Sequence, residues 1–164
     1  MNLQTSHARS LLVMATMAIC LLLSPLCFSQ QSTAINPHAL SDAVLQGDVA
    51  RVKQLIDAGV DVQVLDNRSN PNGRYPLNWA AWQGELEIIN LLLDAGAEVS
   101  KPNRTGFTPL HHAVESGAGA AAELLVKRGA DLKAVNSAGM TPLQFAEFKG
   151  DSEIAAMLRK AESQ

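Results

Sequence analysis

A short motif recurs along this chain at a constant interval of 33 residues, at positions 75, 108 and 141. Its fullest copy is the hexapeptide Thr108-Pro109-Leu110-His111-His112-Ala113, and partial copies begin at Tyr75 and Thr141. Glycines keep the same interval, at positions 73, 106 and 139 before the motif and at 84, 117 and 150 after it. A fixed period of this length is typical of a stacked array of similar supersecondary units.

The motif also predicts where helices begin. A threonine before proline is held outside the helical region, and the proline that follows presets the helical dihedral. The hydroxyl of Thr108 or Thr141 can then accept from the amides of the first turn, and Gln144 follows Thr141 at the spacing of a capping box. Tyr75 replaces the threonine in the earlier copy, where we expect a less ideal helix start.

The motif, the period and the glycine positions together resemble the ankyrin-repeat family, from Asn36 to about Glu162. The resemblance implies an all-α fold, an ankyrin-repeat solenoid of four helix-turn-helix repeats joined by short β-hairpin-like loops. The ankyrin-repeat domain is predicted at residues 36–164, with repeats at about 36–68, 73–105, 106–138 and 139–162. In this family, partners usually bind the concave surface made by the hairpin tips and the first helices.

The first and last repeats depart from the pattern. The first lacks the Thr-Pro-Leu signature, and Asn36-Pro37 is predicted to cap and begin its first helix. Four extra residues separate the first repeat from the second, so we expect a lengthened hairpin tip near 68–73. The final helix, 151–162, carries polar residues on its outer face, as a terminal repeat requires.

Residues 1–29 are predicted to be a signal peptide that is cleaved off. A polar start with Arg9 leads into an uncharged apolar run over 11–23, which is shorter than the roughly 20 residues of a membrane-spanning helix. Small side chains favour cleavage before Gln30, and residues 30–35 are predicted to be a flexible N-terminus. Lipidation at Cys27 is the alternative. Both cysteines lie in this leader, so no disulfide is expected.

Charge and hydropathy limit the classes of partner. Without the leader the chain has 12 basic and 16 acidic side chains, because Arg9 is the leader's one charged residue. No basic stripe could follow a phosphate backbone, so nucleic acid is not an expected partner. No second long apolar run is present, so no membrane span is expected after cleavage. The predicted partner is another protein, and the chain is predicted to be monomeric.

His111 and His112 are the residues that most suggest a metal site. Adjacent helical residues point about 100° apart, however, and no His or Cys cluster supplies the further ligands that zinc needs. We interpret both as structural, with His111 tying its turn together and His112 in the core. The sequence has no nucleophile motif and no phosphate-binding glycine loop, so we predict no catalytic residue, no metal and no cofactor.

Large or charged side chains occupy two registers that the family's geometry places on the concave surface. The predicted partner-binding residues are Trp82, Glu115 and Phe148 at the end of the first helix of each repeat, and Arg74, Phe107 and Met140 at the hairpin. The three aromatic rings would form a strip rimmed by Arg74 and Glu115, which is the composition of a binding hot spot. The alternative is that the rings pack within the stack.

These features predict a non-catalytic adaptor that is exported to the periplasm, or alternatively secreted, and binds a partner protein. The chain resembles small exported bacterial ankyrin-repeat proteins, which act either as helpers of an enzyme, such as an oxidative-stress enzyme, or as inhibitors. An inhibitor or immunity protein against a toxin or hydrolase is therefore the second hypothesis. A metal-binding or catalytic protein is the hypothesis from another class, and the missing motifs disfavour it.

Overall fold

The computed structural model describes residues 36–163. The predicted signal peptide (1–29) and N-terminal segment (30–35) lie outside these residues. The described residues form eight helices: α2 (Ala39–Leu45), α3 (Val49–Asp57), α4 (Pro76–Gln83), α5 (Leu86–Asp94), α6 (Pro109–Ser116), α7 (Gly119–Lys127), α8 (Pro142–Lys149) and α9 (Ser152–Glu162).

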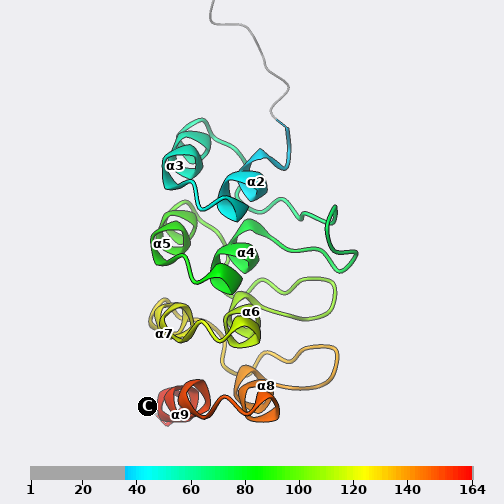
Figure 1. Ribbon diagram of the computed structural model, residues 1–164, viewed down its shortest axis with the longest axis vertical. Helices are drawn as coiled ribbons and strands as arrows, with labels where there is room; N and C mark the ends of the chain where they lie inside the picture. Colours follow the sequence, from blue (N-terminus) through cyan, green and yellow to red (C-terminus); the bar gives the residue numbers. More distant parts are fainter. Residues whose placement is uncertain (1–35, 164) are drawn as a thin grey trace, which may run out of the picture. The chain divides into compact units, whose positions relative to one another are not determined.

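The helices lie in two rows (Figure 1). An inner row contains α2, α4, α6 and α8, and an outer row contains α3, α5, α7 and α9. Each helix packs against its partner in the same repeat and against its counterpart in the next. The loops that enter α4, α6 and α8 extend away from the outer row (Figure 1). The predicted all-α repeat solenoid is confirmed. We call the surface of the inner row and these loops the inner face.

The core is a layer of aliphatic side chains between the two rows. Leu40 of α2, Leu110 of α6 and Leu158 of α9 are all buried in it. The outer helix α5 buries Ile89 with its neighbours at helical spacing. Because each repeat buries its apolar face only against adjacent repeats, the stability of the domain depends on these nearest-neighbour interfaces.

Threonine caps begin α6 and α8, as the motif predicts. Thr141 Oγ1 accepts from the Gln144 backbone N–H at 3.3 Å, and Gln144 Oε1 accepts from the Thr141 N–H at 2.9 Å. In α4 the Tyr75 side chain makes no cap hydrogen bond, and the bond that forms runs from the Tyr75 N–H to Asn78 Oδ1 at 2.8 Å. The helix still begins at Pro76. Its less ideal start consists of a capping box with one of its two hydrogen bonds, the one from the Tyr75 backbone to Asn78.

The first helix begins later than predicted. Asn36 does not cap a helix that starts at Pro37, because its side chain and carbonyl hold a local turn. Its Oδ1 accepts from the His38 N–H at 3.0 Å, and its carbonyl accepts from the Ala39 N–H at 2.8 Å. Asparagine side chains commonly make such turns in competition with helix. The final helix also starts one residue later than predicted, because Asp151 is its N-cap.

Asparagine side chains organise the hairpins before α6 and α8. Asn103 and Asn136 each donate a backbone N–H to the carbonyl four residues on, while their Oδ1 atoms accept N–H groups within the loop. Before α4, the corresponding pair is an antiparallel bridge between Asp66 and Arg74. These positions are eight apart rather than four, so the predicted four-residue insertion is confirmed and lies inside this hairpin.

The inserted hairpin is fastened to the first repeat by an arginine. Asp66 stands where the other hairpins have asparagine, and its carboxylate is buried. Arg68 Nη2 lies 2.8 Å from Asp66 Oδ2 and 2.5 Å from Asp42 Oδ1 of α2. The hydrogen bond from the Arg68 side chain holds the pKa of Asp66 below its usual range. The carboxylate therefore stays charged and keeps the long hairpin attached to α2.

Candidate binding surface of the inner helices

Arg74 lies within the predicted binding surface and not at its rim. It ends the hairpin before α4, and only 8% of its surface is exposed. The guanidinium carbon lies 4.4 Å from the ring centroid of Trp79 and 5.4 Å from that of Trp82. The two rings meet edge to face with their centroids 6.2 Å apart. The cation is held against the rings, so the prediction that Arg74 rims the surface is wrong.

Glu115 joins this hairpin to α6. One carboxylate oxygen, Oε2, accepts from Arg74 Nη2 at 3.0 Å and from His112 Nδ1 at 2.8 Å. The hydrogen bond from His112 holds the pKa of Glu115 below its usual range, with a further contribution from the charge of Arg74. Burial lowers the pKa of His112, so its ring is neutral at pH 7. The charge of Glu115 is therefore balanced by Arg74, and its Oε2 is hydrogen-bonded within the domain.

Aromatic rings continue the inner face from α6 to α8. The ring centroid of Phe107 lies 5.5 Å from that of His112 and 5.4 Å from that of Phe145. Trp79, His112 and Phe145 occupy the same position in three successive inner helices. They form a row of rings along the inner helices, and the hairpin residues Arg74 and Phe107 pack against it.

The two adjacent histidines have separate structural partners. His111 Nε2 lies 3.1 Å from the carbonyl of Met140, and since a carbonyl can only accept, this nitrogen carries the proton. Its Nδ1 then accepts from Thr108 Oγ1 at 2.9 Å. His111 ties its own turn together, as predicted, and it also joins that turn to the next hairpin. Among residues 36–163, no group of three or more His, Cys, Asp or Glu side chains is arranged to hold a metal ion.

The predicted residues do not form one continuous aromatic strip. Phe107 and Met140 are half-buried. The Phe107 ring packs against the ring of His111, and the Met140 carbonyl accepts a hydrogen bond from His111 Nε2. Trp82 and Phe148 are exposed, with exposed fractions of 40% and 76%, in the last turns of α4 and α8. The surface presents two separate exposed rings, and the ion pair of Glu115 lies on the helix between them.

The sequence reasoning missed two kinds of residue on this surface. Trp79 and Phe145 are half-buried on the inner face, and the signal that could have found them is the aromatic ring at one register of three repeats. Lys149 has no such signal in the sequence, because its role depends on a neighbouring repeat. Its Nζ donates to the carbonyls of Val114, at 3.4 Å, and of Glu115, at the C-terminal end of α6. A cation there is favourable because the C-terminal end of a helix carries a partial negative charge.

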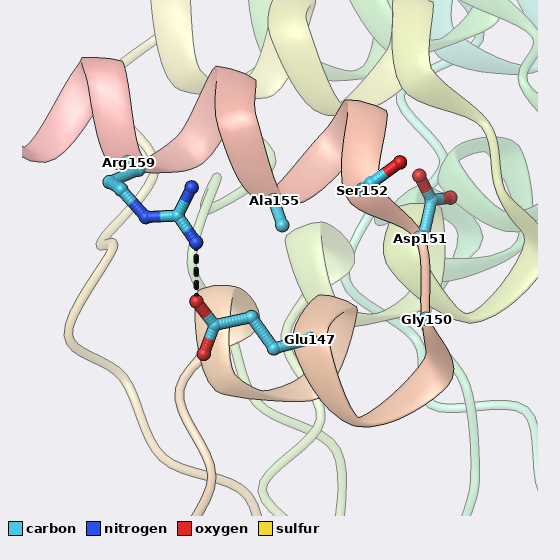
Figure 2. Close-up of a pocket in the computed structure, with 6 residues that line it drawn as sticks. All are labelled: Glu147, Gly150, Asp151, Ser152, Ala155 and Arg159. Atoms are coloured by element: carbon cyan, nitrogen blue, oxygen red, sulfur yellow. Dashed lines mark hydrogen bonds and ion pairs between the residues drawn. The ribbon is translucent and has the colours of Figure 1, made fainter.

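A shallow pocket in the C-terminal repeat is the other candidate site. Figure 2 shows Glu147 of α8 and Arg159 of α9 pointing toward each other across it. Their oxygen and nitrogen atoms are 2.6 Å apart, so the charged groups satisfy one another. The pocket holds about 250 Å³, below the roughly 300–1,000 Å³ of typical small-molecule sites. It offers a ligand little volume and no unpaired charge from this pair.

A family model for ankyrin repeats (three copies) matches residues 40–136 and 103–164. The chain belongs to the ankyrin-repeat family. Ankyrin repeats are protein-interaction modules and are typically non-catalytic, so the inner face is the part of this ankyrin domain to consider for binding. Among residues 36–163, the ankyrin helices are too short and too polar for any of them to cross a membrane.

Known relatives match parts of this ankyrin-repeat chain. The 2-5A-dependent ribonuclease of Mus musculus is 34% identical over 83 residues, covering 51% of this chain and 11% of the ribonuclease. Serine/threonine-protein kinase 12 of Arabidopsis thaliana is 39% identical over 61 residues, covering 37% and 12%. The Notch-regulated ankyrin repeat-containing protein of Xenopus tropicalis is 28% identical over 82 residues, covering 48% and 72%. The chain spans about a tenth of the length of the first two relatives.

Replacing Glu115 with alanine should lower the free energy of unfolding by about 2 kcal/mol, because Arg74 would keep a buried cation without its carboxylate. Equilibrium urea denaturation measures the loss. Glu147→Ala is the matched control, since it removes an ion-paired carboxylate of α8 whose partner Arg159 is exposed. The control should lose less than about 1 kcal/mol. Equal losses would mean that Arg74 does not depend on Glu115.

Proposed function

We propose that this ankyrin-repeat protein is a non-catalytic adaptor that is exported to the bacterial periplasm and binds a partner protein with its inner face. The observation that carries the proposal is the exposure of Trp82 and Phe148, which occupy the same position in α4 and α8. Exposed aromatic side chains provide much of the binding energy at protein interfaces, because they bury a large area at a small cost in conformational entropy.

The spacing of the two rings suits a protein partner. One inner helix, α6, lies between α4 and α8, and packed helices are about 8–10 Å apart, so the rings are separated by about 20 Å. About 13 residues of helix, or about six residues of extended chain, cover that distance. The charge of Glu115 between the rings is neutralised by Arg74, so a partner can cover α6 without burying an unpaired charge there.

The periplasmic location rests on the sequence of residues 1–29. A polar start, an uncharged apolar run over 11–23 and small side chains before Gln30 support export and cleavage. The cleaved chain would contain no cysteine, so an oxidising compartment would not cross-link it. Secretion from the cell is the alternative destination.

The similarity to a ribonuclease and to a protein kinase supports only the interaction role. The matched segments cover 11% and 12% of those proteins, and they are the parts that resemble an ankyrin domain. We therefore extend neither activity to this chain.

Trp82→Ala and Phe148→Ala should each weaken binding of the partner by about tenfold. The partner is first captured from periplasmic extract on the immobilised full chain, identified by mass spectrometry, and then titrated as a purified protein by calorimetry. Phe148→Ala should leave the melting temperature unchanged because its ring is exposed. Trp82→Ala should lose about 1 kcal/mol of stability, because its ring also contacts Arg74 and Trp79.

Leu86→Ala is the matched control for this experiment. Leu86 has the same exposed fraction as Trp82, 40%, but it begins the outer helix α5, so its loss should leave binding unchanged. Unchanged binding in both aromatic variants would reject the inner face as the binding surface. An enzyme made more active by the chain would identify a helper, and one that is silenced would identify an inhibitor. The absence of any reproducible partner would count against both roles.

A further inference from the structure

One carboxylate oxygen on the inner face serves two side chains that both carry a positive charge when protonated. Arg74 Nη2, from the hairpin before α4, lies 3.0 Å from Glu115 Oε2, and His112 Nδ1, on α6, lies 2.8 Å from it. Arg74 and His112 are both buried, with exposed fractions of 8% and 2%. With His112 neutral, the group holds one positive and one negative charge. Its balance therefore depends on His112 remaining unprotonated.

The surroundings of His112 suit only the neutral ring. Its Nδ1 donates to Glu115, so the lone pair lies on Nε2, which is buried and has no hydrogen-bond partner among residues 36–163. The ring of Phe107 packs against the imidazole, with the two centroids 5.5 Å apart. A proton on Nε2 would create a buried N–H donor without an acceptor. It would also add a second cation at the oxygen that Arg74 already uses.

The other charged groups near this site do not offset that proton. Glu115 is the carboxylate that acts on His112, and Arg74 acts on it with the opposite sign. His111 precedes it on α6, and burial lowers the pKa of His111 as well. Lys149, from α8, donates to the Glu115 carbonyl, and its charge contributes to the lowered pKa of Glu115. Once His112 is protonated, the Glu115 carboxylate lies among three cations.

Arg74 is better placed than His112 to move into water. The imidazole is fixed on α6 among buried side chains, so turning it outward would open the core. The guanidinium carbon of Arg74 lies at the inner face, 4.4 Å from the ring centroid of Trp79 and 5.4 Å from that of the exposed Trp82. An arginine can extend its charged group to solvent while its aliphatic part stays packed.

We propose that the inner face contains an acid-sensitive switch, in which a proton from solvent binds His112 Nε2 and Arg74 leaves Glu115 for solvent. The imidazolium then replaces the guanidinium as the counterion of Glu115. One buried cation is exchanged for another, which costs less than burying both beside one carboxylate. Trp79 and Trp82 lose the cation that packs against them, and the hairpin before α4 loses its ion pair with α6.

A fall in pH drives this exchange. Burial lowers the pKa of His112 below its ordinary value of 6.5, and the charge of Arg74 acts in the same direction. Above pH 6.5 the ring is neutral in the folded and in the unfolded chain, and the folded state keeps its full stability. Below pH 6.5 the unfolded chain binds a proton first, so stability falls until the folded chain also binds it. Each such proton raises the unfolding equilibrium constant about tenfold per pH unit.

Tryptophan fluorescence measures the switch directly. The chain contains two tryptophans, and both lie against Arg74, so their emission reports on this site. The full chain is acidified without a partner, and far-UV circular dichroism follows its helix content. The emission should change below pH 6.5 and before any loss of helix signal. Glu115 remains charged in this range, because the hydrogen bond from His112 holds its pKa below the ordinary 4.5.

Three variants test the roles of the individual groups. His112→Phe supplies the ring that α8 has at this position, and its emission should not change with pH before the helix signal is lost. Its unfolding equilibrium constant should also depend less on pH, by about tenfold per pH unit. Glu115→Gln removes the counterion, so its emission at neutral pH should already match that of the acidified unmodified chain. His111→Gln is the matched control, with the residue that α8 has there, and should retain the emission change.

Arg74→Met separates displacement of the arginine from a direct effect of the imidazolium on the rings. The emission of this variant should not change before the helix signal is lost, because no guanidinium is present to leave. An emission change that persists in Arg74→Met or in His112→Phe would overturn the switch. Loss of helix signal with no earlier emission change would overturn it too, because the domain would then unfold without an intermediate rearrangement.

The consequence for binding rests on the proposed function, whereas the switch is measured without a partner. Trp82 is one of the two exposed rings of the inner face, so a captured partner should bind several-fold more weakly to the acidified chain and equally well to acidified His112→Phe. An emission change in a chain that captures no partner would reject the proposed function alone. A partner that requires Trp82 and Phe148, with no emission change on acidification, would reject the switch alone.

Discussion

Leu110→Ala should lower the free energy of unfolding by about 4 kcal/mol. The Leu110 side chain is fully buried in α6, and α6 packs between α4 and α8. Truncation leaves a cavity bordered by two repeats, and neither neighbour can fill it without moving away from its own partner. In a repeat array the interfaces with both neighbours weaken together. Urea denaturation followed by circular dichroism measures the loss.

Leu143→Ala is the control for this substitution. Leu143 occupies the same motif position one repeat later, but it is only half-buried, in the last inner helix α8. Its truncation should lower the free energy of unfolding by about 2 kcal/mol or less. Equal losses for the two leucines would contradict the conclusion that the central repeat is the more tightly packed.

Gly106→Ala should lower the free energy of unfolding by about 3 kcal/mol. Gly106 has a φ of +75°, which costs a residue with a side chain about 1 kcal/mol. A Cβ at this position would also lie 2.9 Å from the Cα of Asn136 and 2.9 Å from the carbonyl oxygen of Val135. Both are backbone atoms of the next hairpin, so the two hairpins would have to separate, at a cost of about 1–3 kcal/mol.

Gly139→Ala isolates the conformational part of that effect. Gly139 has the equivalent position and a φ of +73°, but a Cβ there would meet nothing within 4 Å. The loss should be about 1 kcal/mol, from the backbone dihedral alone. Thermal denaturation of both variants gives the comparison, and a Gly106 variant as stable as the Gly139 variant would show that the hairpins separate freely.

Most helices could be predicted from the sequence because local chemistry determines their ends. The proline of each motif sets the first residue of α4, α6 and α8, and the glycine at the end of each of these helices stops it. The predicted start of α2 at Pro37 was wrong, because the first repeat lacks the Thr-Pro-Leu motif. There the Asn36 side chain accepts the His38 N–H and forms a turn that competes with the helix. The spacing of apolar residues does not show whether the turn or the helix is the more stable.

The candidate site was predicted less well, because the position of a residue within its repeat does not determine which side chains of neighbouring repeats it contacts. Trp82, Glu115 and Phe148 share one position in three inner helices, yet Glu115 is held by an arginine from an earlier hairpin while Phe148 is exposed. A charged side chain in a loop is usually exposed, but Arg74 is buried. Its burial depends on Trp79, which belongs to the helix that follows.

The sequence by itself determined the repeat: its period, its helix starts and the insertion in the hairpin before α4. These features depend on dihedral preferences and capping groups within one unit, which are the same wherever the unit stands in the array. Only the tertiary structure decided how equivalent residues differ. Gly106 meets the backbone of the next hairpin, but no further hairpin follows Gly139 in the residues that the structure describes. Packing depends on the neighbouring repeat, so positions with the same motif differ in burial and pairing.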